Sequence, residues 1–434
     1  MAETLFCDLT PVTVAVPFDA EGPPRLETAN RTQVELIPHD PDAVLPPGHA
    51  ARLVWGFVEG LDLQRFYDAI AARGSRAGRP AIDPKILVAL WLYATIDGVG
   101  SAREVARLCY AHDAYRWLRG GVSVNYHTLS DFRVAHQAAI DDLLTQSITV
   151  LIHRRVVTLT RVAQDGTKVR ASAGIRSFRR RPTLEEAGRL ARQQVTRTAA
   201  QVHGDVNARE AAAQQRAAAE RLARVEEALA QLPQVEAAKR RNRSKATPRA
   251  STTDPDARVM KMMDGGYRPA YNVQFATDVS SQVVVGVAVT TTGADQGELV
   301  PMLDQIARRT GRSPATELAD GGFVSIESIR GASQRGVTLY APIPKGNHAP
   351  GAGSSAGQDA AVSAWRDRMA TDEAKAFYKA RAGTAERINA DAKCHRTLGQ
   401  LGVRGLTKVT TWALWAALAQ NVMRAMEIVP HLMS

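Results

Sequence analysis

The stretch AYNVQFATDVSSQVVVGVAVTT, residues 270–291, decides the fold class of this chain. Its two halves, 270–278 and 282–291, are rich in apolar and β-branched side chains, and a short polar segment separates them. This pattern predicts two strands joined by a turn. Upstream, the β-branched run VVTLTRVAQD predicts a further strand that ends at Asp165. A sheet is therefore expected at the centre of the chain.

Helices and strands alternate in the prediction for the residues that follow. Hydrophobic periodicity and turn residues place helices at 296–310 and 325–335, and strands at 315–320 and 337–343. The last predicted segments are a loop rich in Gly, Ser and Ala at 346–361, a helix at 378–393 and a strongly apolar helix near 411–426. The order predicts an α/β fold, in which a mixed sheet carries helices on both faces.

The first part of the chain is expected to be helical. Residues 1–50 form a Pro-rich leader, and residues 51–155 predict helices with short breaks. The segment VNYHTLSDFRVAH predicts one more helix with four exposed polar residues, Thr128, Ser130, Arg133 and His136. Short polar helices of this kind form either a helix-turn-helix-like DNA-binding domain or a plain supporting bundle, and the sequence leaves both open.

Composition and charge indicate a globular protein with a polyanionic partner. The 434 residues are enough for two or three cores, and the net charge is +11. Three scattered cysteines argue against a disulfide framework and a Cys-based zinc site. No apolar run is long enough to span a bilayer, and residues 1–24 lack the Lys and Arg of a signal peptide. We therefore expect a cytoplasmic protein without a membrane partner.

The positive charge is concentrated in one segment, which we predict to be an arm at residues 171–253. Residues 168–250 hold 19 of the 55 Lys and Arg residues but 8 of the 44 acids. Apolar residues recur at helical spacing on both sides of HGD at 203–205, which predicts a helical hairpin followed by a basic strip. The arm either grips DNA phosphates, which the charge favours, or is a solvated element that self-associates. The basic residues assigned to DNA binding here are Lys168, Arg170, Arg179, Arg180, Arg181, Arg240, Arg241, Arg243 and Lys245.

Three acids are candidates for a metal site. Asp165 and Asp320 each end a predicted strand and precede Gly, and strand ends in an α/β sheet form the crevice where ligands bind. Glu386 lies on the helix at 378–393, with Lys393 two turns later on the same face. Three carboxylates make a hard, oxygen-rich site that suits Mg²⁺ or Mn²⁺. Two such ions can activate a nucleophile and stabilise the leaving oxygen in phosphodiester displacement.

Other polar and aromatic residues are given structural roles. Trp365 and Phe377 could stack on a nucleic-acid base, but packing is the favoured interpretation. Cys394 is expected to be buried in a helix. The acids interpreted as loop caps are Asp254, Asp256 and Asp264.

With these residues in place, the chain resembles the DDE transposases of bacterial insertion sequences. Their third acid lies in a Tyr-x2-Arg-x3-Glu-x6-Lys signature. Here Tyr378 and Arg381 are followed by Glu386 and Lys393, with four residues instead of three between Arg and Glu. QDGTKVRASA and ELADGGFVSIESI resemble the segments that carry the first and second Asp. The likeness also includes GRPAIDPKILVALWLYA and DPDARVMKMMDGGYRPAYNVQFATD, so it extends over most of the chain.

The resemblance implies a fold and an activity. The fold is a ribonuclease H-like catalytic domain made of 156–170 and 254–426, with the arm inserted after its first strand and a helical DNA-binding domain at 51–155. The activity is cleavage of double-stranded DNA at transposon ends and strand transfer to target DNA, by in-line phosphoryl transfer. It implies a bacterial protein associated with the nucleoid.

The resemblance also implies site residues and partners. Asp165, Asp320 and Glu386 would bind two Mg²⁺ or Mn²⁺ ions and be catalytic. Lys393 and Arg381 would contact DNA together with Tyr378. Two transposon ends must be brought together, which favours a homodimer. Two other hypotheses stay open: a catalytically inactive DNA-binding regulator that keeps the fold, and a helical scaffold without activity.

Overall fold

The computed structural model describes residues 40–73, 80–201, 208–241, 243, 245–344 and 359–428. The chain separates after Asp40, and all elements named below belong to the second unit, Pro41–Ser434. Most of the expected leader lies outside the described residues. Its last part contains a short helix, α1 (Pro41–Val44), and the first residue of α2 (Ala50–Glu59).

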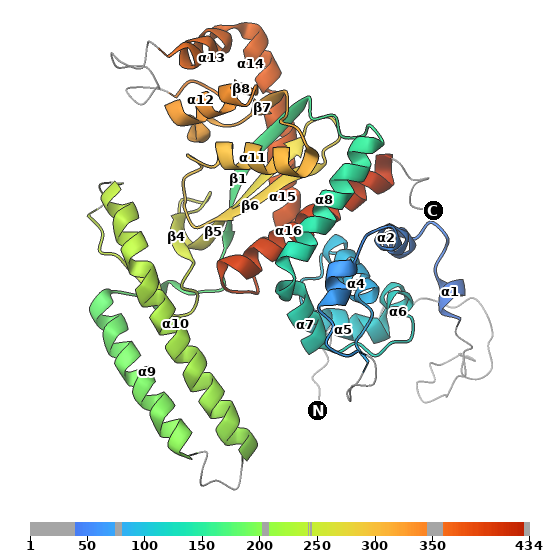
Figure 1. Cartoon of the computed structure of the whole chain (residues 1–434), viewed down its shortest axis with the longest axis vertical. Helices are drawn as coiled ribbons and strands as arrows, with labels where there is room; N and C mark the ends of the chain where they lie inside the picture. Colours follow the sequence, from blue (N-terminus) through green and yellow to red (C-terminus); the bar gives the residue numbers. More distant parts are fainter. Residues whose placement is uncertain are drawn as a thin grey trace, which may run out of the picture. The chain divides into compact units, whose positions relative to one another are not determined.

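The centre of the chain is a six-stranded mixed sheet (Figure 1). Its strands are β1 (Arg161–Arg170), β4 (Arg258–Lys261), β5 (Tyr267–Asp278), β6 (Val284–Thr290), β7 (Thr316–Leu318) and β8 (Thr338–Tyr340). The strand order is β4-β5-β1-β7-β8, and β6 also pairs with β5. β1 pairs antiparallel with β5 and parallel with β7, which in turn pairs parallel with β8. The two strands expected within 270–291 are confirmed, and so is the mixed sheet.

The strand that carries Asp165 is longer than predicted. The predicted strand ends at Asp165, but β1 continues to Arg170, and Asp165 pairs with Phe275 in the middle of the ladder. The predicted end of the strand is wrong because Gly166 does not interrupt the ladder and pairs with Gln274 of β5. Thr167 and Val169 continue the alternation of buried side chains beyond it, as a strand requires. β4 was not predicted, because four residues at the edge of a sheet give little periodic signal.

Helices cover both faces of the sheet. Side chains alternate across β1, so Gln164 and Asp165 face opposite sides. On one side Gln164 donates to the backbone oxygen of Glu298, at the start of α11 (Leu299–Thr310). On the other side β1 contacts the helical segment that follows residue 381, including α15 (Arg387–Cys394). The helices expected at 296–310 and 325–335 are confirmed as α11 and α12 (Ile326–Gln334).

The last helix joins the sheet to the helical region. α16 (Leu406–Ile428) contacts β6, α4 (Pro84–Ile96) and α8 (Gln137–His153). Asn421 of α16 accepts a hydrogen bond from Val284 N and donates one to Val284 O, which satisfies the backbone of an edge strand. The helix expected at 411–426 is thus confirmed and begins earlier. None of the helices within the described residues has the length and apolar character that crossing a membrane requires.

The N-terminal region consists of helices, as expected. Besides α2, α4 and α8 it contains α3 (Gln64–Asp68), α5 (Ala102–Ala111), α6 (Asp113–Arg119) and α7 (Tyr126–Ala135). The predicted exposure of Arg133 is wrong. Its guanidinium lies 4.3 Å from the ring centroid of Trp91 and 3.9 Å from that of Trp412. Arg133 therefore connects α7 to α4 and α16 and is buried as part of their packing.

The basic segment folds as the predicted helical hairpin. α9 (Arg181–Gln201) and α10 (Ala208–Arg241) run antiparallel (Figure 1) and contact each other. Buried Leu184 and Leu232 pack between them, and Arg192 forms an ion pair with Glu226 at 3.0 Å. A two-stranded ladder, β2 (Phe178–Arg179) with β3 (Ala250–Ser251), closes the base of the arm.

One buried acid in the sheet makes stability dependent on pH. Glu317 of β7 is fully buried, and neither carboxyl oxygen has a hydrogen-bond partner among the residues that the structure describes. Burial raises the pKa of Glu317 well above its usual range. A group whose pKa is raised on folding favours the folded state at low pH, and this contribution is lost as the pH rises toward the folded pKa.

We expect Glu317→Gln, which cannot ionise, to unfold at a higher temperature than the wild type at pH 8. The difference should be much smaller near pH 4, where the folded wild type keeps the proton and most of the unfolded wild type does so too. Thermal unfolding followed by circular dichroism at pH 4, 6 and 8 measures this, with the exposed Glu373→Gln as a control. An equal difference at all three pH values would contradict the explanation.

Candidate active site

The side chain of Asp165 contacts the backbone of its own strand, β1, and two side chains from the helical segment that contains Arg381 and Asn389. Its Oδ1 accepts a hydrogen bond from Gly166 N at 3.0 Å, and its Oδ2 accepts one from Asn389 Nδ2 of α15 at 3.0 Å. Arg381 Nη2 lies 2.9 Å from Asp165 Oδ1. Both carboxylate oxygens therefore have partners, and the orientation of the side chain is fixed.

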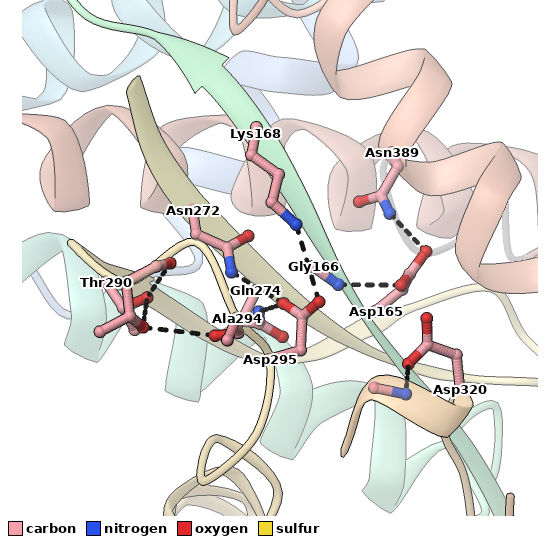
Figure 2. A network of polar contacts seen from close by, with 12 residues as sticks. Asp165, Gly166, Lys168, Asn272, Gln274, Thr290, Ala294, Asp295, Asp320 and Asn389 are labelled. Carbon is pink, nitrogen blue, oxygen red and sulfur yellow. Dashed lines mark hydrogen bonds and ion pairs between the residues drawn. The ribbon is translucent and has the colours of Figure 1, made fainter. Parts of the chain in front are cut away.

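Asp320 lies beside Asp165 because β7 is the parallel neighbour of β1. It follows the end of β7 by two residues and caps a short 3₁₀ turn, Gly321–Phe323, by accepting from Gly322 N at 2.7 Å. Figure 2 shows the Asp165 and Asp320 carboxylates facing the same space. The expected position of Asp320 after a strand and before Gly is thus found.

The guanidinium of Arg381 connects Glu386 to these two acids. Glu386 ends a single π turn, Ala382–Glu386, which leads from Arg381 into α15. Arg381 Nη1 lies 3.9 Å from Glu386 Oε1, and Arg381 Nη2 lies 3.9 Å from Asp320 Oδ2. One guanidinium therefore lies among all three predicted acids. The side chains are 15% exposed for Asp165, 39% for Asp320 and 67% for Glu386, so the cluster opens to solvent on the Glu386 side.

The electrostatics of the cluster reflect its partial burial. Burial raises the pKa of Asp165, the guanidinium of Arg381 opposes this rise, and the carboxylate of Asp320 adds to it. Burial also lowers the pKa of Lys393, and repulsion from Lys168 lowers it further. The carboxylate of Asp165 opposes this lowering, and a further anion near Lys393 would also favour its charged form.

A polar cluster lies on the other face of β1, opposite Asp165 (Figure 2). Asp295, from the loop before α11, accepts hydrogen bonds from Asn272 at 2.7 Å and Gln274 at 2.6 Å. Its Oδ2 lies 3.7 Å from Lys168 Nζ. A Cβ at residue 166 would lie 2.1 Å from Asp295 Oδ1, so only Gly fits between the two clusters. Gly166 is therefore needed for close packing within the strand.

The residues predicted to bind DNA occupy different environments. Arg381 lies within the acid cluster, and burial raises the pKa of the half-buried Tyr378. Lys393 lines a pocket of about 350 Å³ together with Gly100, Thr397 and Trp412. Those predicted residues of the strand end and the arm that are exposed are Arg170, Arg179, Arg180, Arg181, Arg240, Arg241, Arg243 and Lys245.

The structural roles given to other residues are mostly confirmed. Trp365 is fully buried, and Asp264 accepts from Gly266 N within a turn. Asp254 accepts from Gly405 N, and Asp256 from Leu406 N at the start of α16. The prediction for Cys394 is wrong. It ends α15, but it is exposed, because the helix presents this position away from the sheet.

Sequence reasoning missed Asn389 and Asp295. Asn389 is buried and bonded to Asp165, yet nothing in its local pattern distinguishes it from a helix-surface Asn. Asp295 lies in a loop with Thr and Gly neighbours, which is the ordinary context of a turn residue. Each of these residues is recognised only from a contact with a residue distant in sequence, which the local pattern does not reveal.

Two parts of the chain match known families. Residues 39–135 match the family described as Transposase domain (DUF772), and residues 355–426 match the family described as Transposase DDE domain. The second match includes Glu386 and Lys393, whereas Asp165 and Asp320 lie outside both. No curated protein and no solved structure matches the chain. Two separate parts of the chain are thus similar to transposases, which confirms its resemblance to the DDE transposases of insertion sequences.

Proposed function

We propose that the chain is a transposase that cuts DNA at the ends of its element and joins them to target DNA. The observation that carries the proposal is the convergence of Asp165, Asp320 and Glu386 on the single guanidinium of Arg381. Three acids from a strand, a strand end and a helix surround one positive charge there. We further propose that the sheet and its helices form a ribonuclease H-like domain.

The residues of the cluster fit a divalent cation. Their donors are carboxylate oxygens, which Mg²⁺ and Mn²⁺ prefer. Asn389 adds a buried amide oxygen with no partner among the described residues. No described group of three His, Cys, Asp or Glu side chains is already placed to hold a metal. Arg381 supplies the positive charge that these acids require, so Asp165, Asp320 and Glu386 would hold metal ions when Arg381 moves aside.

Bound divalent ions would supply Lewis-acid stabilisation of the attacking and leaving oxygens of a phosphodiester. The residues of this chain would orient the metal-binding carboxylate and bind the DNA phosphates. Asn389 and Gly166 keep the Asp165 carboxylate in one orientation. Lys393, which is partly buried and interacts with the charges of Lys168 and Asp165, would hold a DNA phosphate. Exposed Arg and Lys residues of the arm bind further phosphates and orient the duplex.

DNA binding by the N-terminal helices and by a homodimer completes the proposal. The family match over 39–135 supports the first, because that family is described as a transposase domain. A dimer would bring two element ends together, with the cluster of Asp165, Asp320 and Glu386 in each protomer acting on one end. Binding to the chromosome would place the protein at the bacterial nucleoid.

The activity is tested by incubating the purified chain with Mg²⁺ or Mn²⁺ and a DNA fragment that ends in the inverted repeats flanking its gene. We expect strand nicks at the repeat ends and no nicks in EDTA. Salt-dependent binding without nicks under either metal would instead identify a catalytically inactive DNA-binding regulator. If the chain neither binds nor nicks DNA, the alternative of a helical scaffold without activity would be supported.

A further inference from the structure

The helix that carries Glu386 contains one irregular turn. α14 (Asp372–Tyr378) leads into the π turn Ala382–Glu386 and then into α15. A π turn accommodates one more residue than an α-helical turn, and single π turns inside α-helices are frequent at functional sites. The turn here lies between Arg381 and Glu386, two residues of the acid cluster.

Helix geometry shows what the extra residue does. Each residue of an α-helix rotates the chain by about 100°. Arg381 and Glu386 are five residues apart, so a regular helix would separate them by about 140° around its axis. Arg381 and Asn389, eight apart, would differ by about 80°. If the π turn absorbs one residue, the two separations become about 40° and about 20°.

The observed contacts need the smaller angles. Arg381 reaches Asp165 at 2.9 Å, while Asn389 reaches the other oxygen of the same carboxylate at 3.0 Å. Arg381 also lies 3.9 Å from Glu386. A π turn that absorbs one residue accounts for these contacts, since it removes the offset that a regular helix would impose.

The π turn is held in place from outside the helix. Buried Thr384 donates to the backbone oxygen of Ala380 at 3.1 Å and accepts from Gln282 Nε2 at 3.0 Å. Gln282 lies in the turn between β5 and β6 with a φ of 60°, a conformation that costs energy for a side chain of this type. By contrast, Gly383 is exposed, and a Cβ added there would meet no atom within 4 Å.

We propose that this π turn sets the helical register, that is, it brings Arg381, Glu386 and Asn389 onto the helix face that points to Asp165. We also propose that Asn389 is a positioning residue of the site. Asn389 orients one oxygen of Asp165, and Arg381 orients the other. Gly383 is the residue that the π turn accommodates. The inference rests on the proposed function for its role in cleavage, but the register itself is a property of the fold.

Deletion of Gly383 tests the proposal. Without this residue the segment can form a regular α-helix that keeps the three side chains on one face. We expect the deletion variant to unfold within a few degrees of the wild type and to cleave DNA within about threefold of its rate. Insertion of one Ala after Gly383 adds a second offset of about 100°, and we expect cleavage to fall at least 100-fold. Gly383→Ala, which keeps the chain length, should behave as the wild type does.

A second measurement does not depend on cleavage. The coupling between Asp165 and Asn389 is obtained from urea unfolding of Asp165→Ala, Asn389→Ala and the double variant. It should be equal in the wild type and the deletion background, and absent in the insertion background. A deletion variant that unfolds early, loses cleavage or loses the coupling overturns the register proposal. If the wild type and all variants fail to cleave DNA, while the Asp165–Asn389 coupling is present in the wild type and the deletion variant and absent in the insertion variant, only the proposed function is refuted.

Discussion

Asp165→Asn is expected to reduce DNA strand cleavage by about 1,000-fold or more, because it removes a charge that the proposed reaction needs. The amide keeps the size of the carboxyl group and can still contact Asn389. Asp320→Asn and Glu386→Gln are expected to have effects of the same order. DNA affinity should stay within about twofold in all three variants, since phosphate contacts supply most of the binding energy.

The measurement is the initial rate of nicking of an end-labelled inverted-repeat fragment in Mg²⁺, with binding followed by fluorescence anisotropy. Asp372→Asn is the matched control, because its side chain is 94% exposed and lies on the same helical segment, away from the cluster. Cleavage at the wild-type rate by any one of the three site variants would show that its acid is not required. Loss of DNA binding in parallel would mean that the fold, and not the chemistry, had failed.

Removal of the arm is the second change with a large expected effect. Residues 180–249 contain 15 Lys and Arg residues and 8 acids. The flanking residues Arg179 and Ala250 pair directly in the β2–β3 ladder, so a two-residue Asn-Gly turn can replace the arm without moving its base. Each lost phosphate contact lowers the slope of log affinity against log salt by about 0.9.

If about five arm cations reach phosphates, the slope falls by about 4.5. Between 50 and 200 mM salt, the loss of affinity would then be about 500-fold smaller in the deletion variant than in the wild type. Anisotropy titrations at four salt concentrations measure this. A variant that changes only Arg240, Arg241, Arg243 and Lys245 to Gln separates charge from arm length. An unchanged slope, together with a loss of self-association in sedimentation, would support the alternative that the arm joins protomers.

Much of the fold follows from local patterns in the sequence. The strands at 270–291 and the helices α11, α12 and α16 have strong periodicity and are confirmed. The helical hairpin is confirmed because its apolar residues recur with helical spacing. In contrast, α13 (Ala360–Ala370) was not predicted, because its Ala residues continue the composition of the preceding loop. The loop predicted at 346–361 lies almost wholly outside the described residues.

The site was less accessible to sequence reasoning than the fold. The residue types and order of the three acids make them candidates, yet the sequence does not show that Arg381 lies among them. Its spacing to Glu386 departs by one residue from the family signature, and a regular helix would place the two about 140° apart. In our proposal the π turn corrects that offset, and Thr384 within the turn accepts a hydrogen bond from Gln282, which is distant in sequence. Contacts of this kind are set by tertiary structure and leave no periodic trace.

The most direct test of the account is a crystal structure of the chain soaked in Mn²⁺, with anomalous data collected at the manganese absorption edge. The account predicts an anomalous peak between the carboxylates of Asp165 and Asp320, with the guanidinium of Arg381 displaced from its position 2.9 Å from Asp165. An Arg381 that stays in place beside these acids, with no anomalous peak there at saturating Mn²⁺, would contradict it.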